Sequence, residues 1–511
     1  MRNWFGSVAV SKRCHIVVEF SSVDPGQGGE PVNGECYAAK GSASVENTSL
    51  SMKTPQRPGT ALVGVSALGL ILMGAPARAD ELQSLKQQLE AIQQRIERLE
   101  KSQATQQKAQ KELQTSVDEG TVSPANVVTA GDFKGSFKLP GTDTSLSIFG
   151  YVKGDVIVSS RSAGGQNAIG DQFLVPSAIP VGPTAGANEK NQTTFTARQS
   201  RLGVRSSTPT SYGPLSTLLE VDFYGPGLGG GQTLAGSAGD ELVSNRNAPS
   251  LRHAYGTLGN LGIGQFWTAF ENQAAIPDTL DFGGPVGIIF IRQTQVRWTQ
   301  PFQGGNWEVS LENPETAIAN GAALLRPDDD RYPDIVGRVN LLKTSSGDFW
   351  ASVLVRNIRI DQPGTTDNHW GAALQLGGII PITSAGMDDF RFVINYGNVV
   401  GRYQEMGFFP DGILVNNQIE LSDVVSGFVS YRHFWSPKWR SNLVLSASYA
   451  DHPGGTAGTI NKEARSAHLN LIWSPIASVN LGVEYIYGYR RTQNGLSGNL
   501  NRLQFSGQYS F

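Results

Sequence analysis

The chain has 511 residues, of which 60 are glycine and only 17% are charged, and its net charge is −3. The mean hydropathy of −0.22 resembles that of a water-soluble protein. A transmembrane β-barrel can have such a value, because its apolar residues alternate with polar ones instead of forming long runs. The low and slightly negative charge excludes the basic surface of a nucleic-acid-binding protein, so we expect no nucleic acid as a partner.

An export signal is predicted at residues 52–79. A basic start follows Met52, residues 61–73 form an apolar run, and Ala77 and Ala79 form an A-x-A site before Asp80. This order is typical of a cleaved secretory signal peptide. A membrane-anchoring helix is the competing interpretation, but it requires about 18–20 apolar residues, more than this run supplies.

Residues 1–51 are interpreted as a mis-assigned upstream extension, because a signal peptide normally begins at its own methionine. Both cysteines of the chain, Cys14 and Cys36, lie in that segment. Without residues 1–79, 34 basic and 39 acidic residues remain, which gives a net charge of −5 and no cysteine. Hydrogen bonding and packing, rather than disulfides, must then stabilise the exported chain.

The mature chain is predicted to open with a short coiled-coil helix at residues 80–117 in the periplasm. Its apolar residues recur at alternating spacings of three and four, as the a and d positions of a coiled coil do; they are Leu82, Leu85, Leu89, Ile92, Ile96 and Leu99. Either one amphipathic helix lies on its own barrel, or the helices of several subunits associate beneath an oligomer. Residues 118–145, which contain scattered glycine and proline, are predicted to be a linker.

Residues 146–511 change to a period of two, which indicates β-strands. Soluble sandwiches also alternate, but aromatic residues gather at strand ends here, and tight turns are interleaved with long polar loops, which is typical of barrels in the outer membrane. About sixteen strands fit between the turns. The predicted fold class is all-β: a transmembrane antiparallel β-barrel behind a short N-terminal coiled coil, embedded in outer-membrane lipid with both ends in the periplasm. Sixteen strands enclose an aqueous lumen.

The C-terminal strand carries apolar residues on one face and ends on phenylalanine. Phe505, Tyr509 and Phe511 alternate with polar residues such as Gln504 and Ser510. We expect this pattern to be the signal that the barrel-assembly machinery recognises.

One connection, residues 271–291, is more apolar than the others. We expect it to fold inward and narrow the lumen, with Glu271, Asp278 and Asp281 as the acidic residues of the constriction. The alternative is an outer loop that packs on a neighbouring subunit.

Arg201, Arg205, Arg252 and Arg297 are predicted to face the lumen, since an arginine facing lipid would cost about 2–4 kcal/mol at the midplane. The case is weaker at Arg252, where the same alternation turns His253 toward lipid. Opposite the acidic loop, these arginines would create a transverse field, and basic pores favour anions. Alternatively, they pair with carboxylates of the wall and set no selectivity.

Several segments carry a family resemblance. The segments SRLGVR, LRHAYGTL and VRWTQPFQGGNWEVSLEN resemble strands of the Gram-negative general porins, and the heptad segment, residues 137–158 and ARQSRLG at 197–203 resemble the dicarboxylate-uptake, DcaP-type porins. The resemblance covers about residues 80–511. It implies a homotrimer of sixteen-stranded barrels that pass small, often anionic solutes. The acidic loop departs from the general-porin motif, and a charge of −5 does not itself favour anions.

Other classes of protein fit less well. The six histidines are scattered without metal-ligand or zinc-protease spacing, and no G-x-S-x-G turn occurs, so neither an enzyme nor a metal or other cofactor is predicted. The run at residues 328–330 could hold calcium weakly, but it is also typical of a solvated loop. A structural barrel that anchors the envelope through its coiled coil remains the alternative to a porin.

Overall fold

The computed structural model describes residues 128–163, 169–182, 191–225, 247–344, 346–382 and 387–511, together with isolated helical positions between 93 and 111. The chain divides into two units, Met1–Glu97 and Arg98–Phe511. Three predicted features lie outside the described residues: the upstream extension, the signal peptide with its cleavage site, and the six apolar coiled-coil positions. No helix among the described residues is long and apolar enough to cross a membrane.

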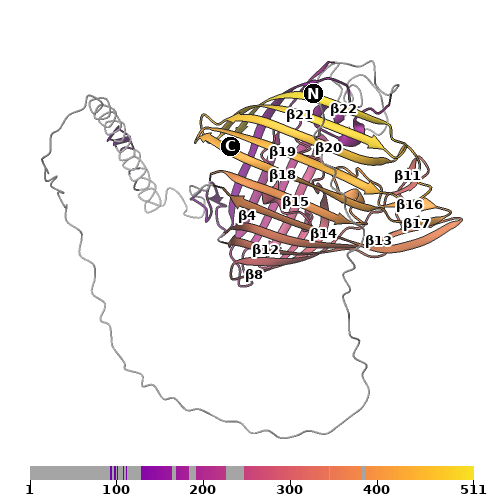
Figure 1. The fold of residues 1–511 in the computed structure, drawn as a ribbon. Coiled ribbons are helices and arrows are strands. Elements are labelled where there is room, and N and C mark those ends of the chain that lie inside the picture. Colours follow the sequence, from indigo (N-terminus) through magenta and orange to yellow (C-terminus); the bar gives the residue numbers. More distant parts are fainter. Residues whose placement is uncertain are drawn as a thin grey trace, which may run out of the picture. The chain divides into compact units, whose positions relative to one another are not determined.

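The described residues of the second unit form a closed antiparallel barrel of sixteen strands, which confirms the predicted fold class (Figure 1). One of the sixteen is split into two segments, β3 (Gln192–Thr196) and β4 (Arg201–Thr208), which both pair with β2. The other fifteen are β2 (Ser145–Ser159), β5 (Leu215–Gly225), β6 (Ala248–Leu258), β7 (Leu261–Trp267), β8 (Arg292–Phe302), β9 (Gly305–Glu312), β12 (Asp334–Thr344), β13 (Gly347–Gln362), β14 (Thr365–Pro381), β15 (Asp389–Gly397), β18 (Asp423–Ser436), β19 (Trp439–Asp451), β20 (Asn461–Trp473), β21 (Val479–Thr492) and β22 (Ser497–Ser510).

The barrel closes where the first and last strands meet. β2 pairs with β22 in an antiparallel register that runs from Tyr151 opposite Ser510 to Ser159 opposite Arg502. Each strand therefore has a neighbour on both sides, and the sheet leaves no open edge to lipid.

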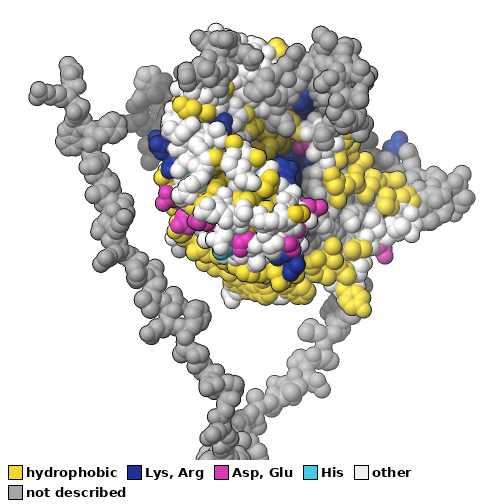
Figure 2. Space-filling model, turned by 90° about the vertical axis from the view of Figure 1, so that its right-hand side faces the viewer, with side chains coloured by type: hydrophobic (Ala, Val, Ile, Leu, Met, Phe, Trp, Pro, Cys, Tyr) yellow, Lys and Arg dark blue, Asp and Glu magenta, His cyan; other side chains and the backbone are white. Residues whose placement is uncertain are grey.

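Side chains alternate between lipid and lumen along each strand. On β19, Leu443 and Leu445 are 45% and 50% exposed, whereas Asn442 and Ser448 are each 1% exposed. Leucine can face lipid without cost, while the polar residues need the hydrogen-bonding partners that the interior provides. Hydrophobic side chains accordingly border the barrel wall in Figure 2, and charged side chains gather within that border.

The two ends of the barrel differ in the length of their connections. Short turns join strands at one end, for example β6 to β7 and β8 to β9, whereas residues 160–191, 226–247, 268–291, 313–333 and 398–422 connect strands at the other end. Short periplasmic turns and long outer loops are the usual arrangement in outer-membrane barrels. Two outer connections are short, since β13 and β14, and β21 and β22, extend into tight hairpins.

The long loops contain most of the remaining elements. Short helical turns occur in three of them, and a four-stranded sheet forms between the loop after β9 and the loop after β15. These elements are α2 (Ile169–Gln172), η2 (Pro176–Ala178), η3 (Gln273–Ala275), η4 (Gly401–Tyr403), β10 (Ile318–Asn320), β11 (Ala323–Leu325), β16 (Gly412–Val415) and β17 (Gln418–Glu420).

The described part of the predicted linker is folded. β1 (Phe137–Lys138) pairs with the start of β2, where Phe137 lies opposite Leu146. The glycines and proline of this segment suggested an open connection, but backbone pairing with the start of β2 fixes its last residues at the short-turn end of the barrel.

The lipid-facing surface can be tested on β5. Leu219 is 51% exposed on that strand, and we expect Leu219→Arg to lower the free energy of unfolding by about 2–4 kcal/mol, because its charge would enter lipid near the midplane. Denaturant titration of the protein in vesicles, followed by tryptophan fluorescence, measures the change.

Ser216→Arg on the same strand is the matched control. Ser216 lines the internal cavity described below, so its variant should differ from the original protein by less than about 0.5 kcal/mol. Equal destabilisation by both arginines would contradict the assignment of the two faces.

Candidate functional site

The connection between β7 and β8, residues 268–291, lies inside the barrel and is called the inward loop below. A hydrogen bond from the Thr268 amide to the Ile291 carbonyl (3.2 Å) closes its two ends. Beside them, the Thr268 hydroxyl and the Ala269 amide donate to Oε1 of Glu312 on β9 (3.0 and 2.8 Å). The root of the loop is therefore fixed to the wall from which it departs.

The middle of the inward loop reaches the other side of the lumen, at the barrel seam, where β2 pairs with β22. The amide of Leu280 donates to Oε2 of Glu484 on β21 (2.6 Å), and its carbonyl accepts from Lys153 Nζ on β2 (2.6 Å) and Gln504 Nε2 on β22 (3.0 Å). Glu484 is itself oriented by Nδ1 of His468 (2.9 Å). One residue of the loop thus joins strands on both sides of the seam.

A glycine allows the inward loop to touch the wall of β18 and β19. Gly287 has a φ of +84°, and a Cβ there would lie 2.7 Å from the Gly427 nitrogen and 2.8 Å from the Ala447 carbonyl oxygen. The Gly287 carbonyl accepts a hydrogen bond from Asn395 Nδ2 (3.0 Å). A residue with a side chain would be strained in this conformation and would also push the loop off the wall.

The three predicted acidic residues lie on the inward loop, but each is bound by the wall or by another loop. Glu271 Oε2 accepts from Gln375 Nε2 (3.1 Å). Asp278 pairs with Arg440. Asp281 Oδ1 accepts from the Leu174 amide (2.9 Å) and lies 3.9 Å from Arg502 Nη1.

The predicted opposition of Glu271, Asp278 and Asp281 to the arginines of β4, β6 and β8 is not found among the described contacts. The reason is that the loop crosses to a wall with basic and amide groups of its own, which take up the carboxylates. Burial also raises the pKa of Glu271 to about 8, with partial compensation from Gln375 and Arg338. Glu271 is therefore mostly uncharged at neutral pH and contributes little to a transverse field.

Arg201 and Arg252 lie together on the wall of β4 to β6 and share a carboxylate. Oε1 of Glu220 is 3.6 Å from Arg201 Nη1 and 2.6 Å from Arg252 Nε. Arg252 Nη1 also contacts Asp222 Oδ2 (2.7 Å). This pairing corresponds to the alternative interpretation, in which the lumen arginines pair with carboxylates of the wall. However, the basic groups nearby outnumber these two carboxylates.

A β-bulge turns two successive residues of β6 into the barrel. His253 is opposite Glu220 and Leu251 is opposite Val221, so Arg252 has no partner in the register. Arg252 and His253 are 1% and 4% exposed, and the His253 ring packs on Phe266. Alternation had directed His253 toward lipid; the extra residue of the bulge corrects that prediction.

Arg297 also faces inward but belongs to a different group of charges. Its Nη1 contacts Glu308 Oε2 (3.1 Å), while Arg338 Nη2 contacts Oε1 of the same carboxylate (2.7 Å). Arg338 donates further to the Glu271 carbonyl at the start of the inward loop. Arg297 thus helps to fix the loop root and does not join Arg201 and Arg252.

Sequence reasoning missed Arg292 at the start of β8. Its guanidinium lies 4.9 Å from the Trp267 ring and 5.6 Å from the Phe290 ring, and that of Arg252 lies 5.6 Å from the Phe282 ring of the inward loop. Arg292 lies five positions before Arg297, and an odd separation would place the two on opposite faces of an alternating strand. The only available signal was its position beside an apolar loop that turns inward.

An open cavity of about 720 Å³ lies between this wall and the inward loop. Arg201, Arg205, Glu220, His253 and Trp267 are among its lining residues. The cavity contains the predicted inward arginines of β4, and it extends toward the short-turn end of the barrel, where β4 ends.

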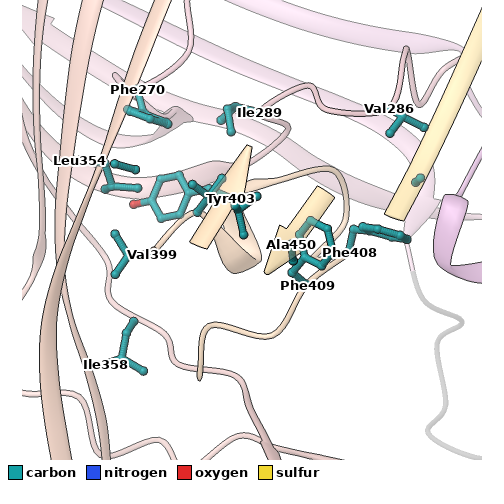
Figure 3. Packing of buried hydrophobic residues seen from close by; sticks show 14 of the residues in the cluster. Phe270, Val286, Ile289, Leu354, Ile358, Val399, Tyr403, Phe408, Phe409 and Ala450 are labelled. Carbon is teal, nitrogen blue, oxygen red and sulfur yellow. The ribbon is translucent and has the colours of Figure 1, made fainter. Parts of the chain in front are cut away.

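The loop after β15 also folds into the barrel. The long loops were expected to be polar, but in residues 399–417 five buried apolar residues belong to one cluster with wall and inward-loop residues such as Leu354 and Ile289 (Figure 3). They are Val399, Val400, Tyr403, Phe408 and Phe409. The adjacent apolar pairs in the sequence were the signal that could have indicated an inward fold.

A buried ion-pair network fastens this loop. Arg356 on β13 contacts Asp334 Oδ2 on β12 (3.1 Å) and Asp411 in the loop. Asp411 also accepts from the amides of Arg402 (2.9 Å) and Ala317 (2.9 Å). The network joins the loops after β9 and β15 to the wall, and none of its residues lines the cavity beside β4 to β7.

The C-terminal residues lie on the outer face at the seam. Phe505, Tyr509 and Phe511 are 47%, 54% and 55% exposed. The Phe511 amide donates to the Gly150 carbonyl (3.0 Å), and the Gly150 amide donates back to Phe511 (3.2 Å). The last residue therefore takes part in the pairing that closes the barrel.

Solved structures of channels are similar to this chain. The outer membrane channel DcaP of Acinetobacter baumannii is 22% identical and matches 75% of this chain and 100% of its own, with a TM-score of 0.61. The anion-selective porin from Comamonas acidovorans is 13% identical over 72% of this chain and 100% of its own (TM-score 0.43). Salmonella typhi OmpF, in complex with daunomycin, is 9% identical over 72% and 98% (TM-score 0.46).

The sequence also matches a family model. No curated protein sequence matches the chain. The model described as DcaP outer membrane protein matches residues 69–511, which include the whole barrel. The chain therefore belongs to the DcaP outer membrane protein family and is a β-barrel porin of the outer membrane.

Proposed function

We propose that this porin passes small hydrophilic solutes by passive diffusion, without catalysis, and favours anions such as dicarboxylates. The observation that carries the proposal is the excess of positive charge beside the cavity. Arg201, Arg205, Arg252 and Arg292 lie on this side of the lumen, whereas Glu220 and Asp222 are the carboxylates that pair with them. Four guanidinium groups against two carboxylates leave two positive charges uncompensated, and basic pore linings favour anions.

The constriction in this proposal is the inward loop. Its carboxylates are occupied on the opposite side by Gln375, Arg440, Leu174 and Arg502. They therefore offset the arginines only weakly, and a solute beside Arg201 would meet a net positive wall. Low-dielectric barrel walls strengthen such a field inside the lumen.

A non-conducting structural barrel, anchored to the envelope through its coiled coil, is the second candidate. The apolar filling by the loop after β15 favours it, because a fully plugged lumen would not conduct. The open cavity beside Arg201 favours the channel. Open-channel currents in a planar bilayer distinguish the two: the porin conducts, whereas the structural barrel does not.

Ion selectivity tests the arginine argument. In a potassium chloride gradient, Arg201→Gln should lower the chloride-to-potassium permeability ratio by about tenfold, since one charge about 6 Å from an ion in water is worth ~0.7 kcal/mol, attractive for chloride and repulsive for potassium. Reversal potentials measure this ratio.

Arg465→Gln is the control, because that side chain is 64% exposed and lies on β20, away from the cavity. Its reversal potential should equal that of the original protein. An original channel that prefers cations, or an Arg201→Gln channel with unchanged selectivity, would contradict the anion preference.

Gly287 tests the constriction. Gly287→Val should push the inward loop away from β18 and β19, cost about 1–3 kcal/mol of stability through overpacking, and lower the single-channel conductance, because the loop would move toward the cavity on its other side. The control is Gly454→Val, because a Cβ at Gly454 has no neighbour within 4 Å. A folded Gly287→Val channel with unaltered conductance would show that the loop does not limit the current.

We also propose that the protein assembles as a homotrimer with its coiled coil in the periplasm, and that the barrel-assembly machinery recognises the C-terminal residues with Phe511. The heptad stripe of residues 80–117 supports association, because a trimer brings three helices to high effective concentration. A gently extracted sample should migrate as a trimer on a gel and shift to the monomer after boiling. A monomeric mass by light scattering in mild detergent would refute the trimer.

A further inference from the structure

The segment that leads into β2 is fastened to the short-turn end of the barrel. The amide of Lys138 donates to the Thr129 carbonyl and that of Gly131 to the Ser136 carbonyl (both 2.9 Å), which closes residues 129–138 into a hairpin. The Asp132 amide donates to Oγ of Ser145 (2.9 Å) at the first residue of β2. The hairpin is therefore fixed relative to the pore mouth.

The tip of this hairpin carries Phe133 into the cavity lining. The Arg205 guanidinium lies 5.1 Å from the Phe133 ring and 5.5 Å from the Phe149 ring. All three side chains line the same cavity as Arg201. The two rings come from different segments, the hairpin and β2, and both contact one guanidinium.

Arg205 differs in its partners from the other arginines predicted to face the lumen. Among the described residues, no carboxylate lies within ion-pair distance of Arg205, whereas Arg201, Arg252 and Arg297 each have at least one. Arg292 also contacts aromatic rings, but it does not line the cavity. The described contacts of the Arg205 guanidinium are with aromatic rings, which attract a cation but leave its charge uncompensated. Of the two arginines that line the cavity, Arg201 and Arg205, Arg205 is thus the one whose charge is more available to a passing anion, and both rings lie beside its guanidinium.

Of the two rings, that of Phe149 is held by the wall. A Cβ on Gly203 would lie 2.3 Å from the Phe149 ring, so this ring packs flat on the glycine of the neighbouring strand. Phe133, by contrast, lies on the hairpin and not on a strand of the barrel wall. Changes at Phe133 can therefore alter the access to Arg205 without changing the barrel wall.

We propose that Phe133 is a selectivity-determining residue, which narrows the periplasmic mouth of the pore and shields the Arg205 guanidinium from anions. This inference rests on the proposed function, since it assumes that ions pass the cavity. It assigns a second constriction, separate from the inward loop and formed by the segment between the predicted coiled coil and the barrel.

The test compares Phe133→Ala with the original full-length protein in planar bilayers with a potassium chloride gradient. A cation–π contact at a partly exposed site is worth ~0.5–1 kcal/mol, so loss of the ring should raise the chloride-to-potassium permeability ratio by about two- to fivefold. The single-channel conductance should rise as well. In an Arg205→Gln background, Phe133→Ala should no longer change the permeability ratio.

Two further variants keep the result interpretable. Phe137→Ala removes a ring from the same hairpin that does not line the cavity, and it should leave both measurements unchanged. Asp132→Ala removes the carboxylate that accepts from Ser145 (3.1 Å) and pairs with Lys138 (3.2 Å). It should loosen the hairpin and change both quantities in the same direction as Phe133→Ala.

The outcomes separate this inference from the proposed function. If the original protein does not conduct, the proposed function fails and the inference fails with it. If the original protein conducts and prefers anions, but Phe133→Ala and Asp132→Ala leave selectivity and conductance unaltered, the inference alone is overturned. An equal effect of Phe133→Ala in the Arg205→Gln background would also overturn it, because the ring would then act without the guanidinium.

Discussion

The constraint on which the structure depends is that every backbone amide and carbonyl in the lipid must find a partner within the protein. β2 satisfies this at the seam by pairing with β22 on one side and with β3 and β4 on the other. The last residue extends the pairing through the two bonds between Phe511 and Gly150. Closure removes every sheet edge, and it also creates an interior whose polar residues, such as Gln504, need partners of their own.

Those partners come from the loops. Charges as buried as Arg356 are costly unless each is paired and hydrogen-bonded, and Arg356 meets this condition with Asp334 on the wall and Asp411 from a loop. The same requirement explains the contacts of Leu280, whose backbone amide and carbonyl satisfy Glu484 and Lys153 at the seam. Loops that fold inward are therefore part of the stability of the barrel as well as of its channel.

The alternation in the sequence was enough to predict the barrel, its sixteen strands and the inward direction of Arg201, because a period of two decides the face of each residue. It failed for His253, since a single bulge reverses the face of every residue beyond it. The alternation also could not predict the partners of the charged residues. Asp281, for example, lies near Arg502 and the Leu174 amide because of the path that its loop follows. No local pattern encodes that path. The fold is therefore more predictable than the site.

The electrostatic asymmetry of the lumen follows from the way in which the inward loop is attached. A loop that crosses the pore must form hydrogen bonds or ion pairs on the far side to stay in place, and here Asp278 and Asp281 form them. Once these carboxylates are engaged there, they no longer balance the arginines of the near wall. Glu220 and Asp222 balance only part of that charge. The positive field that we propose thus arises because acidic groups are withdrawn from the near wall, and not because two charged walls of opposite sign face each other across the pore.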